Sequence, residues 1–368
     1  MWLTLAHPRT PDMSTPAPTM KAMVTTGHGG YDVLQYRDVP VPRLGSGEVL
    51  LQVLAAGINN TDINTRVGWY GASATSEEGK GSAPSGWNGA TPFPLIQGAD
   101  CCGRVVAFSE DVANIALGTR ALVRSCMREA GFSAPHTRWL GTDGDGAFAQ
   151  YVKVPATEVF AIQSGWTDAQ LATIPCAYGT AENMLQRVGL RAGERVLVTG
   201  ASGGVGSAVV QLAGRRGATV MAVTTRSKQA QLRELGAHQV LCREDDLLSQ
   251  CGEQCVDVVV DNVAGPGWGA LLKALRRGGR YVSSGAIAGA EVALDMRDLY
   301  LKDITLYGCT AWDEPVFGDL IGYIEREEIK PLLAATFPLQ DMAAAQQQFL
   351  RKQHMGNLVL IPDAPCAA

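Results

Sequence analysis

The chain has 368 residues, and at roughly 100–200 residues per domain this length predicts two domains. Hydrophobic residues make up 46% of the chain and charged residues 18%, which excludes wholesale disorder. The net charge of −5 argues against nucleic acid as a partner. Because no apolar run reaches about 18 residues, we expect no membrane partner either.

The N-terminal end carries no folding signal. Residues 1–19 contain four prolines and no hydrophobic periodicity, which predicts a disordered leader. The alternative is that they precede a natural start at Met13 or Met20. The first apolar residues are too few for a signal sequence, and no basic segment precedes them, so we expect a cytoplasmic protein. Nine cysteines at irregular spacing favour reduced thiols over a disulfide framework.

The next segment, from residue 20 to 158, is typical of an irregular β-rich domain. Short strand patterns alternate there with turns rich in Gly and Pro. The expected strands are 21–25, 36–42, 47–58, 98–108, 117–123 and 146–155. Residues 71–91, rich in Gly, Ser and Glu, predict a long loop, either a surface insertion or a lid beside a site.

The pattern then changes to alternating helices and strands. Thr167 is expected to cap a helix that Pro175 interrupts, and a second helix follows over 176–188. Near-continuous β-branched runs predict strands at 195–200, 218–224, 239–242, 256–261, 279–284 and 303–309. Such runs between helices indicate a parallel sheet covered on both faces, and six strands fit a doubly wound Rossmann fold.

The C-terminal part is expected to return to the first domain through a helix over 317–326 and a strand over 356–362. We therefore predict an α/β fold in which a dinucleotide-binding domain, 159–310, is inserted in a β-rich domain. The latter comprises 20–158 plus 311–362. The cleft between the two domains is the expected site.

A run of small residues follows the strand at 195–200 and precedes a helical pattern. This arrangement presents backbone N–H groups to a diphosphate. The predicted cofactor-binding residues of the turn are Ala201, Ser202, Gly203, Gly204, Val205 and Gly206. A glycine-rich turn without a ligand is the alternative.

The end of the second parallel strand discriminates between cofactors. NAD sites usually place an acid there, whereas this chain has Thr224, Thr225, Arg226 and Lys228. Cations and hydroxyls bind a 2′-phosphate, so we predict NADP(H) as the cofactor. The alternative is that Arg226 and Lys228 lie on a solvated helix start.

The chain from 21 to 362 resembles the medium-chain dehydrogenase/reductase superfamily, in particular its zinc-free quinone oxidoreductase and enoyl reductase branch. The resemblance rests on the segments 57–62, 98–100, 200–206, 261–263 and 283–285. It implies a GroES-like catalytic domain for the β-rich part and a cleft against the Rossmann domain. It also implies that the strand ends carrying Asn262, Val263, Ser284 and Gly285 meet the nicotinamide.

The zinc alcohol dehydrogenases of the same superfamily hold a catalytic metal with a Cys, a His and a second Cys. The matching positions here are Asn59, Ala99 and Cys176. A single thiolate does not supply the roughly three protein ligands of a catalytic zinc. The four-cysteine loop of a structural zinc is absent too, because Cys126 alone lies between 103 and 175. We therefore predict no metal.

Polar residues follow the first strong strand. The predicted catalytic residues are Asn59, Thr61 and Tyr70. The segment resembles that of enoyl thioester reductases, in which a Tyr at the position of Tyr70 is a proposed proton donor; a phenol is protonated at neutral pH. Gly71 stands where that family often has Pro, so a Tyr that only packs at the loop edge is the alternative. Asn59 is expected to orient the substrate carbonyl or the nicotinamide ribose.

These features predict an NADPH-dependent reductase of quinones or α,β-unsaturated carbonyl compounds that works without zinc, since no Lewis acid is available for a simple ketone. Two alternatives stay open. One is an NADP-linked alcohol or aldehyde dehydrogenase, and the other is a crystallin-like nucleotide-binding protein without turnover. The strand at 303–309 is expected at a sheet edge, which favours a homodimer over a monomer with a covered edge.

Overall fold

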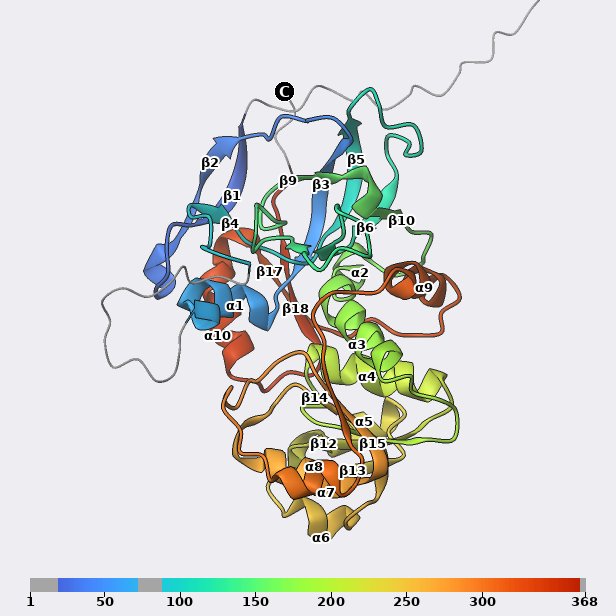
Figure 1. The fold of residues 1–368 in the computed structure, drawn as a ribbon. Helices are drawn as coiled ribbons and strands as arrows, with labels where there is room; N and C mark the ends of the chain where they lie inside the picture. Colours follow the sequence, from blue (N-terminus) through green and yellow to red (C-terminus); the bar gives the residue numbers. More distant parts are fainter. Residues whose placement is uncertain (1–18, 72–87, 365–368) are drawn as a thin grey trace, which may run out of the picture.

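The computed structural model describes residues 19–71 and 88–364 (Figure 1). The predicted leader lies outside the described residues up to position 18, while Thr19 already begins the first strand. Positions 72–87 of the expected loop also lie outside them. Within the described ranges, no helix combines the length and apolar character needed to cross a bilayer.

The β-rich domain is built on two sheets. The smaller sheet has the order β2-β1-β4, and the larger has the order β10-β6-β5-β3-β18-β17 with β9 paired to β3. The strands are β1 (Thr19–Thr25), β2 (Leu34–Pro40), β3 (Glu48–Gly57), β4 (Leu95–Ile96), β5 (Cys102–Phe108), β6 (Arg120–Val123), β9 (Tyr151–Pro155), β10 (Val159–Ala161), β17 (Leu333–Pro338) and β18 (Asn357–Ile361), beside a small hairpin of β7 (Cys126–Met127) and β8 (Arg138–Trp139).

The second domain holds the predicted six-stranded parallel sheet. Its order is β13-β12-β11-β14-β15-β16, which is the doubly wound order with the first strand beside the fourth. The strands are β11 (Arg195–Val198), β12 (Thr219–Thr224), β13 (Gln239–Cys242), β14 (Val256–Asp261), β15 (Leu275–Ser283) and β16 (Thr305–Gly308). The structure thus confirms the predicted α/β architecture.

Alternation along the central strand explains why this sheet is covered on both faces. Val196 and Val198 belong to one buried cluster, while Leu197 between them belongs to another on the opposite face. The helices of this part are α2 (Asp168–Leu171), α3 (Pro175–Arg187), α4 (Gly204–Arg215), α5 (Gln229–Glu234), α6 (Leu247–Cys251), α7 (Trp268–Ala274) and α8 (Met296–Tyr300).

The chain returns to the β-rich domain at its C-terminal end, as predicted. Strand β18 pairs antiparallel with β3, so the parallel sheet is an insertion between segments of one domain. The helices here are α9 (Pro315–Glu325) and α10 (Met342–Leu350). Strand β17 and helix α10 were not expected from the sequence.

The domain limits differ from the expected ones in two places. Strand β10 pairs with β6, so the larger sheet continues to Ala161, past the boundary expected at 158. Helix α9 packs against α3, and the Phe317 ring of α9 meets the Phe160 ring of β10 edge to face. This helix therefore joins the two domains rather than belonging to one sheet.

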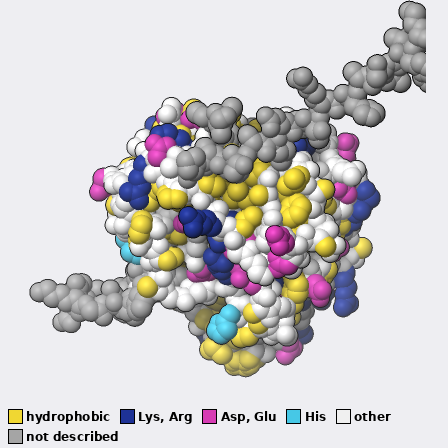
Figure 2. Space-filling view, turned by 90° about the horizontal axis from the view of Figure 1, so that it is seen from above, with side chains coloured by type: hydrophobic (Ala, Val, Ile, Leu, Met, Phe, Trp, Pro, Cys, Tyr) yellow, Lys and Arg dark blue, Asp and Glu magenta, His cyan; other side chains and the backbone are white. Residues whose placement is uncertain are grey.

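Figure 2, seen from the β-rich end, shows acidic and basic side chains interspersed on the surface of the molecule.

Candidate active site

A cavity of about 460 Å³ lies between the two domains. The β-rich domain lines it with the segment that follows β3 and with the end of α10. The parallel-sheet domain lines it with the first residues of α4 and the residues after β14 and β15. The predicted residues that line it are Asn59, Thr61, Tyr70, Gly204, Val205, Asn262, Ser284 and Gly285.

The turn after β11 is compact enough to carry backbone donors to the cleft. Gly203 caps α4, and a Cβ at Gly206 would overlap the carbonyl oxygen of Gly200. The first N–H groups of a helix have no partner within it, so Gly204 and Val205 can present theirs to an anion. Ala201 differs from the prediction, because it is fully buried and its N–H donates to the carbonyl of Val223 at 3.2 Å.

The strand ends that follow β14 and β15 are organised by a buried carboxylate. Asp261 accepts hydrogen bonds from the hydroxyls of Thr199 and Tyr281 and from the N–H of Val263 at 2.9 Å. The side-chain amide oxygen of Asn262 accepts a hydrogen bond from the hydroxyl of Ser284 at 2.8 Å. Asn262 and Ser284 therefore reach the cleft together, whereas Val263 is absent from its lining.

The end of β12 differs from the sequence-based interpretation. Thr224 is buried, and the hydroxyls of Thr225 and Ser227 lie 3.3 Å apart. Residues 224–228 contain no acid, but the structure brings one from the connection after β13. Both carboxylate oxygens of Asp245 lie 3.1 Å from the Arg226 guanidinium.

Lys228 is likewise not free to meet a phosphate in this conformation. Its side chain is buried, and its ammonium donates to the carbonyl oxygens of Lys352 and His354 at 2.6 Å each. Burial lowers the pKa of this ammonium. Lys228 thus ties the parallel-sheet domain to the connection between α10 and β18.

On the other wall, Asn59 caps helix α1 (Asn60–Val67), which was not expected from the sequence. The backbone N–H of Asn59 donates to the Asp62 carboxylate at 2.7 Å, and its side-chain amide donates to Asp100 at 2.6 Å. Asp100 also accepts from the N–H of Cys176 at 2.6 Å, in the first turn of α3. Burial raises the pKa of both Asp62 and Asp100 to about 7.

The predicted proton donor belongs to a polar cluster at the mouth of the cleft. Tyr70 lies in a short 3-10 turn (Trp69–Gly71) and donates from its hydroxyl to the Thr61 hydroxyl at 3.3 Å. The Asn64 amide lies 3.5 Å from the same phenol oxygen. Burial raises the pKa of Tyr70, so the phenol stays protonated and remains a donor at neutral pH.

The positions that match zinc ligands do not form a metal site here. The Asn59 amide faces Asp100, Ala99 is fully buried without a donor atom, and burial raises the pKa of the Cys176 thiol well above its ordinary value. Across residues 19–71 and 88–364, no group of three His, Cys, Asp or Glu residues is placed to hold a metal ion. The donor set does not fit a catalytic zinc.

Sequence analysis missed the one charged residue among the described residues that line the cleft. Lys352 follows α10, and its ammonium donates to the Asn60 side-chain oxygen at 2.9 Å. Burial, with a smaller effect of Lys228, lowers the pKa of Lys352 to about 8. Its backbone has a positive φ of 52°, which is uncommon for a residue with a side chain. No motif surrounds Lys352; only the pairing of β18 with β3 brings it to the site.

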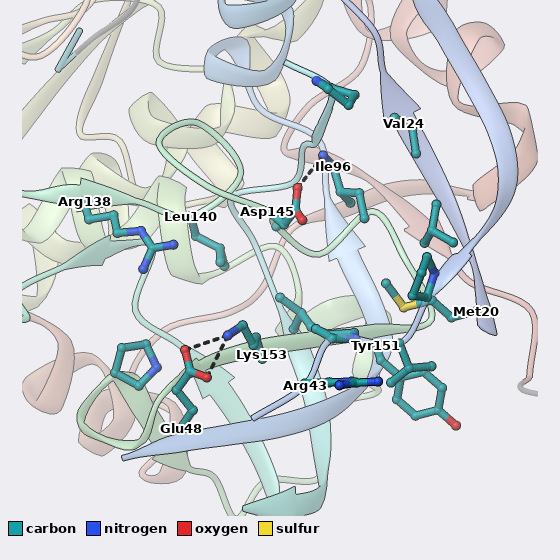
Figure 3. A pocket seen from close by; sticks show the side chains of 18 of the residues that line it. Met20, Val24, Arg43, Glu48, Ile96, Arg138, Leu140, Asp145, Tyr151 and Lys153 are labelled. Carbon is teal, nitrogen blue, oxygen red and sulfur yellow. Dashed lines mark hydrogen bonds and ion pairs between the residues drawn. The ribbon is translucent and has the colours of Figure 1, made fainter. Parts of the chain in front are cut away.

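A second cavity, of about 570 Å³, lies within the β-rich domain (Figure 3). Met20 and Val24 of β1 line it, together with Tyr151 of β9 and the ion pair between Lys153 and Glu48 at 2.8 Å. It shares no lining residue with the cleft between the domains. The candidate active site is therefore the cleft alone.

Two family models match the chain. An alcohol dehydrogenase GroES-like domain matches residues 45–164, and a zinc-binding dehydrogenase domain matches residues 204–326. A crystal structure from Sinorhizobium meliloti, provisionally named an alcohol dehydrogenase, is 42% identical over 95% of this chain and 99% of its own, with a TM-score of 0.89. The chain belongs to the medium-chain dehydrogenase/reductase superfamily of oxidoreductases, whose members bind nicotinamide cofactors.

Some of the curated relatives carry reductase or oxidoreductase names. An acryloyl-coenzyme A reductase from Metallosphaera sedula is 28% identical over 93% of this chain and 99% of its own. A quinone oxidoreductase from Rattus norvegicus is 25% identical over 95% of this chain and 100% of its own. A cobalt- and zinc-bound alcohol dehydrogenase from Pyrobaculum aerophilum is 28% identical, with a TM-score of 0.80, over 94% of this chain and 100% of that one.

Proposed function

We propose that this protein is an NADPH-dependent reductase of quinones or α,β-unsaturated carbonyl compounds that works without zinc. The observation that carries the proposal is the cleft wall itself. It holds a protonated phenol on Tyr70, hydrogen-bonded to Thr61, in the same lining as Asn59 and Cys176, two of the three positions that match zinc ligands. The two reductase names among the relatives support the same reaction class.

The described residues fit a dinucleotide. Gly204 and Val205 offer helix N-terminal N–H groups to the diphosphate, and Lys352 adds a cation from the other domain. The connection that carries Lys352 touches the turn directly, because the N–H of Gly356 donates to the carbonyl of Ser202 at 3.2 Å. Arg226 is the exposed cation at the end of β12 and supports a 2′-phosphate, hence NADPH.

When bound, the nicotinamide supplies a hydride to the β-carbon of the conjugated acceptor. The electron pair then moves to the carbonyl oxygen, where it must be stabilised and met by a proton. Tyr70 donates that proton once its hydroxyl turns from the Thr61 oxygen to the substrate oxygen, while the Asn64 amide still faces the phenol oxygen. Asn59, held by Asp100, keeps the adjoining wall polar.

A screen of NADPH oxidation with quinones, enones and enoyl-CoA thioesters, run with and without a chelator, tests this proposal. We expect turnover of at least one conjugated class that is insensitive to the chelator. Activity restricted to alcohols or aldehydes, and lost with the chelator, would contradict it.

An NADP-linked alcohol or aldehyde dehydrogenase is the second candidate, because the 42% identical structure bears a provisional alcohol dehydrogenase name. In the direction of reduction its hydride acceptor would be a simple carbonyl, and among the described residues hydrogen-bond donors are what could polarise it. Oxidation of simple alcohols with NADP⁺ would favour this candidate. Cofactor binding without turnover of any class would favour the crystallin-like alternative.

We further propose a homodimer in the cytoplasm, formed through the edge strand β16. Six large hydrophobic side chains are exposed in the chain segment that runs from the end of β15 through α8 into β16. They are Ile287, Val292, Met296, Tyr300, Leu301 and Leu306. An edge strand with exposed apolar neighbours is a template for pairing with a second chain.

A further inference from the structure

The cation expected to select the cofactor is already paired. The Arg226 guanidinium donates to both carboxylate oxygens of Asp245 at 3.1 Å each. The backbone N–H of Arg226 also donates to the Glu244 carboxylate at 3.2 Å. Both acids follow β13, the strand next to β12, so the topology brings them to this point although they lie about twenty positions further along the chain.

The place matters because the end of the second strand is where a doubly wound fold meets the group on the adenosine ribose. A 2′-phosphate carries up to about two negative charges and is attracted by a guanidinium but repelled by a carboxylate. Lys228, the other cation of this segment, is bound to two backbone carbonyls. Arg226 is therefore the cation within 224–228 that remains exposed to solvent, with 71% of its side chain accessible.

We infer that Asp245 sets the preference between NADPH and NADH, by holding the Arg226 guanidinium for which a 2′-phosphate would compete. The inference rests on the proposed use of a nicotinamide dinucleotide in the cleft. Asp245 acts through Arg226 and is a positioning residue. A phosphate must displace it before a bidentate contact with the guanidinium can form.

The exposure of the pair sets the size of the effect. The Asp245 side chain is 49% accessible, so the ion pair is screened by water and easily broken. Displacement therefore lowers the affinity for NADPH without abolishing it. With NADH the pair stays intact, and the nearby carboxylates can accept hydrogen bonds from the free ribose hydroxyls. We expect both dinucleotides to bind, with a modest preference for NADPH.

Titration of the full-length protein with NADPH and with NADH, without substrate, measures this directly through the two Kd values. Asp245→Asn keeps the shape and removes the charge, so the Kd for NADPH should fall about fivefold while that for NADH stays within about twofold. Arg226→Ala should raise the Kd for NADPH. In the double variant the gain from Asp245→Asn should vanish, because the residue it acts through is gone.

Asp303→Asn is the matched control. Asp303 pairs with Arg277 at 2.7 Å on the surface of the same domain, at the edge where the parallel strands begin. The Asp303→Asn substitution removes the same charge as Asp245→Asn but should leave the ratio of the Kd for NADPH to the Kd for NADH unchanged. An unchanged ratio in Asp245→Asn, with wild-type protein binding NADPH, would overturn this inference alone. Wild-type protein that binds neither dinucleotide would overturn the proposed function as well.

Discussion

Tyr70 owes its chemistry to its neighbours rather than to its position in a motif. The phenol is half-buried, and two polar side chains of α1, Thr61 and Asn64, meet its oxygen. Asp100 holds Asn59 beside them and also caps α3 at Cys176. The cluster therefore joins the segment after β3 to the helix that leads into the parallel sheet.

Replacing Tyr70 with Phe tests its role as donor. The phenol hydrogen bond is lost while the ring remains, so kcat for the conjugated acceptor should fall about 100-fold and the Kd for NADPH should hardly change. Steady-state rates and a binding titration measure the two quantities. Tyr151→Phe, in the separate cavity of the β-rich domain, is the control and should keep full activity. Equal rates for Tyr70→Phe and wild type on every accepted substrate would remove Tyr70 as the donor.

Lys352 predicts a pH dependence of cofactor binding. Its pKa is lowered to about 8, so its charge is present below that pH and is lost as the pH rises through it. The Kd for NADPH should therefore rise severalfold between about pH 7 and about pH 9, because a charge-assisted contact with the diphosphate disappears. Titrations at several pH values measure it.

Two variants separate this residue from other titrating groups. Lys352→Arg stays charged over the whole pH range, so it should bind NADPH tightly with a Kd that does not change with pH. Lys352→Met carries no charge at any pH, so it should bind NADPH weakly with a Kd that is equally independent of pH. A wild-type slope retained in Lys352→Arg would mean that another group is responsible.

At the level of elements, helix α3 depends on close contact with the segment before α9. Gly179 faces the Trp312 indole, and an added Cβ would overlap that ring. The indole is almost fully buried and stacks on Phe317 of α9, with ring centroids 6.0 Å apart. This packing fixes the helix whose first turn holds Asp100 at the site.

Gly179→Ala should destabilise the protein by about 1–3 kcal/mol, because a well-packed core does not accept an extra methyl group. Gly214→Ala is the counterpart in helix α4, where a Cβ would meet open space. That variant should gain about 0.5–1 kcal/mol from helix propensity. Urea unfolding of both variants measures the free energies. An unchanged free energy of unfolding in Gly179→Ala would show that α3 and Trp312 separate easily.

The sequence predicted the parallel sheet well, because strands such as β14 (Val256–Asp261) are β-branched runs that alternate with helical segments. It missed α1 because the segment Asn60–Val67 is mostly polar, although Asn59 and Asp62 have the spacing of a helix cap. At the site, local motifs pointed to Tyr70, Thr61 and Asn59, and all three line the cleft. Lys352 and Asp245 were not, because only the pairing of distant strands brings them there.

At the scale of the whole molecule, the exposed edge strand predicts assembly. Leu306 of the edge strand β16 is 38% accessible. Leu306→Lys should shift the protein from dimer to monomer, because a lysine on an edge strand opposes pairing. Sedimentation equilibrium measures the mass, and Leu117→Lys, at an exposed leucine of the other domain, is the control. A wild-type protein that is monomeric at all concentrations would contradict the proposed dimer.

The proposed reaction is hydride transfer to a conjugated carbon in a cleft whose described residues include no fitting set of zinc ligands. The most direct test follows deuterium from NADPH, labelled at its transferable position, into an accepted enone, with a chelator present. The account predicts a single deuterium on the β-carbon of a saturated carbonyl product, with the rate unchanged by the chelator. Deuterium on the carbonyl carbon of an alcohol product, formed only without the chelator, would contradict it.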